Sequence, residues 1–509
     1  MRAARFVAKN TALMSLGLFA GRILAFFVFR KLTGEAETVG TGVWGVAVDL
    51  SSMALTIANF GLVVLITREV VKNREATWSI LWAALRIRWL LSLLIYGLLV
   101  VYVFATGYDA PTRMVILVMA LGVVLEATGM ACDSVLQGHE KVEHQTTSQL
   151  VSAVVYFVLA WWWLEAGYGI VGVAWANVLS RLARLMVLVP LMARHCGPWR
   201  RGRPGEGIGM MWMVRMGVPV FMATTFGIIS YKIDTVMIME MLGKLGAGIY
   251  TIGHRPLDLF LIIPSIFAMA LFPSLQRYRE QAAAGEAGDV ERMGERALRY
   301  LNLLIMPLTL FCILAAGPII RLIATSSDLE PSISVFQIVI LGLPVQAQSH
   351  VYNRLLMTAG REKVFMRLAL AVLFTNVALN LLLIPILKWH GAAMTTVLSL
   401  LLGYLLHRRY TRQAGLRVPS RRGLLGTVAA LAVAWFGAVA IARLAVPGWH
   451  VTWRALPDDA LFPFAAMTLV TGVLYAAALF GLKVVDRADV RMLLDALPGR
   501  GGEEPEEPA

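Results

Sequence analysis

Residues 80–105 read ILWAALRIRWLLSLLIYGLLVVYVFA, a nearly unbroken run of apolar side chains. A helix of about 20 such residues crosses a hydrocarbon core roughly 30 Å thick, and the chain contains about 14 runs of this kind. In lipid, only helices and closed barrels satisfy every backbone polar group, and barrel strands would show short alternating patterns instead. The sequence therefore predicts an all-α integral membrane protein with about 14 transmembrane helices.

The composition leaves no room for a large soluble domain, because 58% of the residues are hydrophobic and only 15% are charged. Hydropathy places the predicted spans at residues 11–32, 42–66, 80–105, 114–137, 147–164, 169–191, 210–241, 246–275, 298–324, 333–359, 364–387, 391–407, 424–444 and 463–482.

Lysine and arginine residues gather in alternate loops, of which 194–203, 277–299 and 408–422 are the richest. Because cytoplasmic loops carry the excess of basic residues, both termini are predicted to be cytoplasmic in a multi-pass protein of the cell inner (plasma) membrane. The net charge of +14 is therefore a topology signal. Basic residues scattered over many short loops do not form a nucleic-acid-binding face.

The two halves of the chain resemble each other. Gly21-Arg22-Ile23 and the later Thr41-Gly42-Val43-Trp44 correspond to Tyr231-Lys232-Ile233 and the later Ala247-Gly248-Ile249-Tyr250. The copies lie an even number of spans apart, so the halves would be related by an axis along the membrane normal. We predict six-helix lobes at 1–200 and 201–420, an extra helix pair at 421–484 and a cytoplasmic tail at 485–509.

Several predicted spans carry charged or polar side chains, which are costly in lipid and mark functional sites. Arg22 lies near the middle of the first span. In the second span, Asp49, Ser52, Thr56 and Asn59 have the spacing of one helix face. Such a polar stripe is expected to face a bundle interior or a wet cavity.

The seventh and eighth spans carry a second group of charges. Lys232 and Asp234 are two residues apart, so they point in different directions and are expected to meet different partners. Tyr250, Arg255 and Asp258 fall within about one face of the next span. Further in-span polar residues are Glu126, Asp133 and Gln137 in the fourth span, His350 and Arg354 in the tenth, and Asn376 and Asn380 in the eleventh.

The cations suggest a binding site for an anion. Arg22, Lys232 and Arg255 recur in the two halves, and cations that face a cleft suit a phosphate-bearing substrate. Further substrate-binding candidates are Arg354, Asn59 and Tyr250.

The carboxylates allow two interpretations. Asp49, Asp234 and Asp258 are candidates for carrying a coupling proton or ion. Alternatively, they neutralise nearby cations and fix helix packing: Asp49 or Asp234 would pair with Arg22, and Asp258 with Arg255.

Motifs of other function classes are missing from the sequence. There is no phosphate-binding Gly-x-x-x-x-Gly-Lys-Ser/Thr loop and no Gly-x-Ser-x-Gly nucleophile motif. His139 and His144 lie in a predicted cytoplasmic turn without further ligands, which disfavours a zinc site. We therefore expect a protein that is not an enzyme, with no catalytic residues, no metal site and no cofactor.

A series of short motifs resembles one transporter family. The motifs are Phe29-Arg30-Lys31-Leu32-Thr33-Gly34, Asn59-Phe60-Gly61-Leu62, Thr67-Arg68-Glu69, Leu136-Gln137-Gly138-His139-Glu140-Lys141, Ile233-Asp234-Thr235, Gly248-Ile249-Tyr250, Leu271-Phe272-Pro273-Ser274-Leu275, Ala359-Gly360-Arg361-Glu362-Lys363, Asn376 to Asn380, and Leu383-Ile384-Pro385. In this order, over residues 9–410, they resemble the multidrug/oligosaccharidyl-lipid/polysaccharide (MOP) exporter superfamily, in particular its O-antigen-type flippases.

The resemblance implies two six-helix lobes around a central cleft, plus two extra helices. It implies that undecaprenyl-pyrophosphate-linked oligosaccharide moves to the outer face by alternating access, for lipopolysaccharide or exopolysaccharide synthesis. Cations on the first, seventh and eighth helices of such flippases meet the pyrophosphate, and Arg22, Lys232 and Arg255 stand at those places. Membrane lipids, and a polymerase and glycosyltransferases of the same pathway, are the implied partners. This chain departs from the family pattern after its first span, where Leu32-Thr33-Gly34 precedes an acidic turn.

Four other functions remain open from the sequence. A cation-coupled multidrug exporter and a lipid II flippase belong to the same superfamily, although a cationic drug would favour an acidic cleft. A membrane glycan polymerase or ligase would need a sizeable outside loop, and the predicted loops are short. A non-catalytic scaffold would leave the buried cations unexplained.

Overall fold

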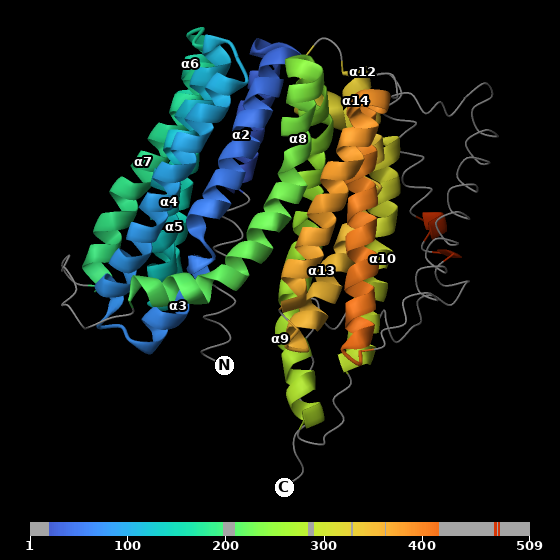
Figure 1. Cartoon of the computed structure of the whole chain (residues 1–509). Coiled ribbons are helices and arrows are strands. Elements are labelled where there is room, and N and C mark those ends of the chain that lie inside the picture. Colours follow the sequence, from blue (N-terminus) through green and yellow to red (C-terminus); the bar gives the residue numbers. More distant parts are fainter. Residues whose placement is uncertain are drawn as a thin grey trace. The chain divides into compact units, whose positions relative to one another are not determined.

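The computed structural model describes residues 20–196, 209–283, 290–326, 329–361, 363–416, 473–475 and 477–478. Within these ranges the chain is helical with short turns and contains no strand, which confirms the predicted all-α class (Figure 1). Nine segments of this part of the chain are long and apolar enough to cross a membrane. The predicted tail and nearly all of the predicted C-terminal helix pair lie outside the described residues.

The helices follow the predicted spans closely. Residues 20–35 form the described part of the first helix. The others are α2 (Glu37–Asn59), α3 (Leu62–Lys72), α4 (Thr77–Ala105), α5 (Ala110–Gly138), α6 (Val142–Glu165), α7 (Gly169–Cys196), α8 (Met210–Phe260), α9 (Ile262–Ala283), α10 (Val290–Leu314), α11 (Ala316–Ile323), α12 (Glu330–Val339), α13 (Gly342–Thr358) and α14 (Lys363–Gln413).

The two longest helices are each two spans joined at a sharp break. In α8 the break is Gly243, with φ 75° and ψ −171°, and in α14 it is Lys388, with φ 54° and ψ −135°. Both breaks fall between spans that hydropathy separates. Glycine adopts a positive φ without steric cost, whereas lysine does so only where the surrounding structure imposes it.

The second predicted span differs from its expected outline. The first helix bends at Ala36 and passes almost directly into α2, so the connection is tighter than a loop. At its other end α2 stops at Phe60 and Gly61, which both have positive φ. A Cβ on Gly61 would contact Val220 of α8, so a glycine at this turn allows α8 to approach.

The described helices group into two units. Of the described residues, the first contains those from 20 to 259, 319–339 and 361–406, and the second contains those from 260 to 318, 340–360 and those from 407 onward. In the first unit, α5 packs on α2, α3, α4 and α7, and α6 packs on α7. In the second unit, α9, α10 and α13 pack on one another. The division into lobes at 1–200 and 201–420 remains a prediction.

Small residues let α2 and the second part of α8 meet backbone to backbone within the first unit. A Cβ on Gly248 would overlap the carbonyl oxygen of Thr38, and one on Gly42 would overlap the carbonyl oxygen of Lys244. Gly45 likewise leaves space for the side chain of Thr251. Close approach through small residues is the usual way in which helices associate in a membrane.

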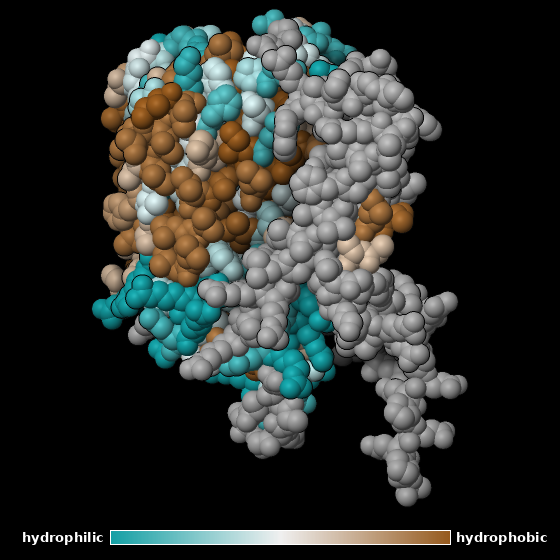
Figure 2. Space-filling model, turned by 90° about the vertical axis from the view of Figure 1, so that its right-hand side faces the viewer, coloured by the Kyte–Doolittle hydropathy of each residue, from teal (hydrophilic) through white to brown (hydrophobic). Residues whose placement is uncertain are grey.

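Apolar side chains cover the outside of the helices. On α4, Leu90, Leu94, Leu98 and Val101 are each about 60–67% exposed and form one helix face. Figure 2 shows a band of hydrophobic residues on one side of the molecule, with hydrophilic residues gathered below it. A water-soluble monomer rarely exposes so large an apolar patch, so these surfaces suit contact with lipid.

Candidate functional site

Lys232 of α8 is enclosed by two carboxylates in the first unit. Its Nζ lies 3.2 Å from Asp49 Oδ1 of α2 and 3.5 Å from Asp258 Oδ2. Tyr231 donates a hydrogen bond of 2.5 Å to the other oxygen of Asp258. The positive charge of Lys232 is therefore already neutralised by side chains of the protein.

Arg255 differs from Lys232. Its guanidinium lies over the ring of Phe29, 5.5 Å from the centroid. Within the described part of the chain, it has no carboxylate within 4 Å. The expected pair between Arg255 and Asp258 does not form, because Asp258 turns toward Lys232 and Tyr231. Arg255 thus forms no direct ion pair with the described residues, although Asp258 lies close enough to interact with it electrostatically.

Arg22 likewise forms no ion pair with the described residues. Its side chain is exposed and lines a cavity of about 390 Å³. Arg22 and Phe29 are seven residues apart, so they share one face of the first helix about 10 Å from each other. Since Arg255 covers Phe29, both cations lie along this face.

Asp234 lies among neutral donors and is only 1% exposed. Asn380 Nδ2 donates to Oδ1 at 2.7 Å, while Thr396 and Tyr250 donate to Oδ2 at 2.6 and 3.0 Å. Asn380 also donates to Asn376 Oδ1 at 3.1 Å, and its own Oδ1 is buried without a hydrogen-bond partner. As predicted, Asp234 and Lys232 meet different partners.

The oxygen-bearing side chains around Asp234 suit a hard cation. Carboxylate, amide and hydroxyl oxygens are the ligands such cations prefer. Within the described residues, no group of three or more His, Cys, Asp or Glu side chains could hold a metal ion. The cluster carries one carboxylate, so its formal charge matches a monovalent cation.

His254 lies beside this cluster. Its ring stacks on Tyr250 at 5.4 Å and meets Tyr231 edge-on at 5.5 Å. Its Nε2 is buried without a hydrogen-bond partner. His254 therefore fills the space between the Lys232 and Asp234 environments.

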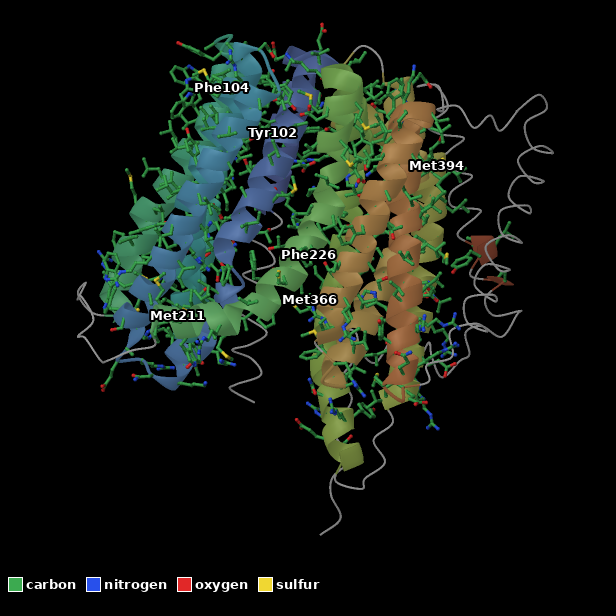
Figure 3. The ribbon with its side chains drawn as sticks, in the orientation of Figure 1. Tyr102, Phe104, Met211, Phe226, Met366 and Met394 are labelled. Carbon is green, nitrogen blue, oxygen red and sulfur yellow. The ribbon has the colours of Figure 1, made fainter. Side chains whose placement is uncertain are left out.

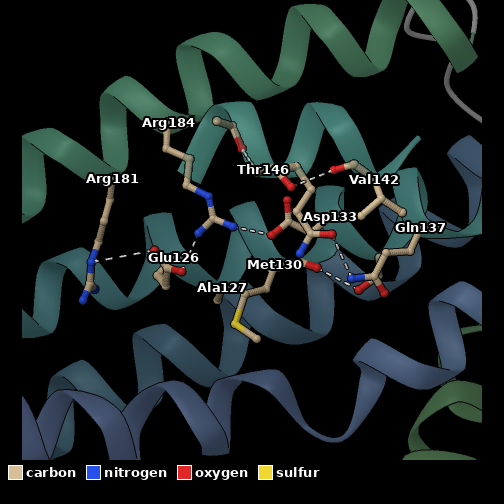
Figure 4. Close-up of polar contacts among 12 residues, drawn as sticks. Glu126, Ala127, Met130, Asp133, Gln137, Val142, Thr146, Arg181 and Arg184 are labelled. Carbon is tan, nitrogen blue, oxygen red and sulfur yellow. Dashed lines mark hydrogen bonds and ion pairs between the residues drawn. The ribbon is translucent and has the colours of Figure 1, made fainter. Parts of the chain in front are cut away.

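A second charge network crosses the helices of the first unit (Figure 4). Arg184 of α7 donates to Glu126 Oε1 at 2.5 Å and also to Asp133 Oδ2. Arg181 Nε lies 3.8 Å from Glu126 Oε2. Glu126 and Asp133 were noted in the sequence, but their arginine partners were not. The signal was present, because Arg181 and Arg184 stand at i, i+3 inside an apolar span.

The cavity that contains Arg22 adjoins this network. Its lining residues are Gly21, Arg22, Val63, Glu126, Met130, Asp133, Ser134, Gln137, Gln145, Gln149 and Arg184. Gln137 Nε2 donates to Gln145 Oε1 at 3.0 Å across it. Most of the lining residues are thus polar or charged, with Gly21, Val63 and Met130 among them.

The two remaining candidates lie in different environments. Asn59 Nδ2 contacts Met130 Sδ at 3.1 Å, which places Asn59 behind one wall of the cavity, and its Oδ1 is buried without a partner. Arg354 belongs to the second unit, where its guanidinium lies 5.6 Å from the ring centroid of Phe272.

Polar contacts join α8 to the turn between α4 and α5. Lys244 pairs with Asp109, and Tyr102 and Tyr108 both donate to Glu240. Figure 3 labels Tyr102 near this end of α4. The hydrogen bond from Lys244 is the main reason that the pKa of Asp109 is lowered, so the pair stays ionised at neutral pH. These contacts lie at the same end of the helices as the approach of Gly42 to Gly248.

The helical arrangement is a fold that occurs among transporters of the MOP superfamily. Three solved structures share the fold. The lipid II flippase MurJ in an inward closed conformation aligns with TM-score 0.70 at 15% identity, covering 92% of this chain and 98% of that one. An inward-facing multidrug resistance MATE family transporter aligns with TM-score 0.62 at 13% identity, covering 79% of this chain and 97% of that one. A MOP superfamily transporter from Pyrococcus furiosus aligns with TM-score 0.55 at 14% identity, covering 81% of this chain and 96% of that one.

Sequence comparison narrows the class. The chain belongs to the polysaccharide biosynthesis protein family, whose profile matches residues 7–279, more than half of its length. The MatE profile matches residues 219–382. The probable flippase AglR of Haloferax volcanii is 28% identical over 196 residues, which cover 37% of this chain and 40% of that protein. The match thus spans less than half of that relative.

Proposed function

We propose that the chain is a flippase that moves undecaprenyl-pyrophosphate-linked oligosaccharide across the cytoplasmic membrane by alternating access. The observation that carries the proposal is the position of Arg22 and Arg255, neither of which has an ion pair among the described residues, along one face of the first helix. A pyrophosphate has several oxygens, and guanidinium groups bind phosphate oxygens well. Family membership supports a glycan-linked substrate.

The roles of the predicted site residues separate in this proposal. Arg22 and Arg255 receive the headgroup. Lys232 joins them only where the headgroup displaces Asp49 or Asp258, because both carboxylates now hold it. The end of the helices that carries the contact between Lys244 and Asp109 would face the outside.

Two rival substrates are a cationic drug and lipid II. Exporters of cationic drugs need an uncompensated acidic cleft, whereas the unpaired groups beside the first helix are arginines. A lipid II flippase shares the need for pyrophosphate binding, so the glycan attached to the lipid is the discriminating variable. Lipid-linked glycan also implies glycosyltransferases and a polymerase as partners in the same pathway.

The test of headgroup binding uses Arg255→Gln and Arg22→Gln in the full chain, purified in detergent. Each variant should bind undecaprenyl pyrophosphate at least tenfold more weakly, since a hydrogen bond to a charged group contributes about 1.5–3 kcal/mol. Arg194→Gln, at the exposed end of α7, is the matched control and should bind as the wild type does. Unchanged affinity in both variants would remove the basis of the proposal.

We further propose that Asp234 binds the coupling ion, and that this ion is sodium. Asp49 and Asp258 are held by Lys232, whereas Asp234 has only neutral neighbours and the free Asn380 Oδ1 beside it. The carboxylate of Asp234 now accepts hydrogen bonds from neutral donors, and a bound sodium ion would take their place. A proton on the same carboxylate is the alternative.

Asp234→Asn removes the negative charge and keeps the shape of the side chain. In proteoliposomes at fixed pH, the wild type should transport several-fold faster when a sodium gradient is applied across the vesicle membrane. Asp234→Asn should lose this dependence on sodium. Glu143→Gln, at the start of α6, should keep it. Dependence on a pH difference instead of sodium would make the ion a proton, and dependence on neither would refute the role of Asp234.

A further inference from the structure

The cavity beside Arg22 has the size and chemistry of a binding site in its own right. Its volume of about 390 Å³ lies within the range of roughly 300–1,000 Å³ that is typical of small-molecule sites. It lies wholly inside the first unit, between the first helix, α3, α5, α6 and α7.

The two carboxylates of this cavity already have cationic partners. Arg184 contacts both Glu126 and Asp133, and Arg181 lies beside Glu126, so Arg22 is the lining cation without an ion pair among the described residues. Both Nη atoms of Arg184 are already engaged by the two carboxylates. A phosphate inside the cavity would therefore meet two carboxylates and only one uncommitted cation, which disfavours an anion there.

The lining instead offers many neutral donors and acceptors. Gln137 donates to Gln145 and Gln149 is hydrogen-bonded to Asp133, so each amide keeps further donor or acceptor capacity for a ligand. The Ser134 hydroxyl donates to Met130 O and can still accept. Arg184 is 5% exposed, and its Nε has no hydrogen-bond partner. A ligand with many hydroxyl groups needs this mixture of donors and acceptors.

The position of the cavity relates it to Arg22 and Arg255. Arg22 lines the cavity and also shares a helix face with Phe29, which Arg255 covers. A headgroup between Arg22 and Arg255 would therefore place the next part of the molecule beside the glutamines.

We propose that this cavity binds the neutral sugar residues that follow the pyrophosphate of the substrate. The inference rests on the proposed flippase function and adds where the glycan is recognised. Gln137, Gln145 and Gln149 are then specificity-determining residues, because a site built to hydrogen-bond hydroxyl groups discriminates against ligands that lack them.

The experiment measures binding to the full chain in detergent with three probes. They are undecaprenyl pyrophosphate, the same lipid carrying each of a panel of neutral hexose and N-acetylhexosamine disaccharides, and the free disaccharides. The wild type should bind at least one glycosylated lipid about tenfold more tightly than the bare lipid. Gln149→Leu and Gln137→Leu should each reduce this advantage about fivefold, as expected for a lost neutral hydrogen bond, and leave bare-lipid affinity unchanged. Gln413→Ala, at the exposed end of α14, should change neither.

The outcomes separate the cavity from the proposed function. If both kinds of lipid bind but sugar makes no difference, or the glutamine variants weaken both equally, the cavity inference is wrong and the flippase proposal stands. If neither lipid binds, while a free disaccharide binds and the glutamine variants abolish this, the flippase proposal is wrong and the cavity stands. Failure of all three probes to bind overturns both.

Discussion

Arg184→Met is expected to destabilise the protein by about 3–5 kcal/mol, the usual cost of removing one partner from a buried ion pair. Arg184 holds Glu126 and Asp133 at once, and its own side chain is 7% exposed. Without it, Asp133 loses its ion pair inside the helix bundle, and Glu126 keeps the longer contact with Arg181. Thermal unfolding and monodispersity in detergent would measure the loss.

Two further variants make this result specific. Arg194→Met removes an exposed arginine from the same helix and should leave the unfolding temperature unchanged. Arg184→Met combined with Asp133→Asn leaves Glu126 with Arg181 and should recover much of the lost stability, because Asp133 no longer carries an unpaired charge. A single variant as stable as the wild type would show that the network contributes nothing to folding.

Gly248→Val is expected to open the contact between α2 and α8 and to abolish transport. Any Cβ at this position overlaps the backbone carbonyl of Thr38, which cannot move aside as a side chain can. Overpacking costs about 1–3 kcal/mol where neighbours can adjust, so a clash with backbone should disfavour this closed arrangement by about 3 kcal/mol. The protein would then remain in conformations in which the two helices are apart.

Maleimide labelling of Thr251→Cys reports on this contact. The three native cysteines would first be replaced. Thr251 is 6% exposed, so the introduced thiol should react slowly in the otherwise unchanged protein and at least tenfold faster when Gly248→Val is added. Gly227→Val is the control on the same helix, since a Cβ there meets nothing within 4 Å. Continued protection of the thiol together with normal transport would contradict the expected opening.

Helices and their breaks could be predicted from the sequence because they are local. Hydropathy separated the spans that meet at Gly243 and Lys388, and the two-residue spacing of Lys232 and Asp234 indicated separate partners. The residues Asn376 and Asn380, noted only for being one turn apart, prove to surround Asp234. Local spacing thus found the polar residues but not the groups they form.

Partners distant in sequence could not be predicted. Asp49 was considered for Arg22, yet it pairs with Lys232, and Asp258 does likewise rather than neutralising Arg255. Hydropathy and spacing fix which face of a helix is polar, but not which other helix meets it. Helix packing alone decides which cations remain without an ion pair.

Lys232 and Asp234 occupy a single turn of α8 and contact α2 on one side and α14 on the other. A rotation of α8 about its own axis by a few tens of degrees would alter both sets of contacts at once. Occupancy at either side must then change affinity at the other by an equal factor, since thermodynamic linkage is reciprocal. If Asp234 binds the coupling ion as proposed, this one turn of helix links ion binding to movement of the substrate.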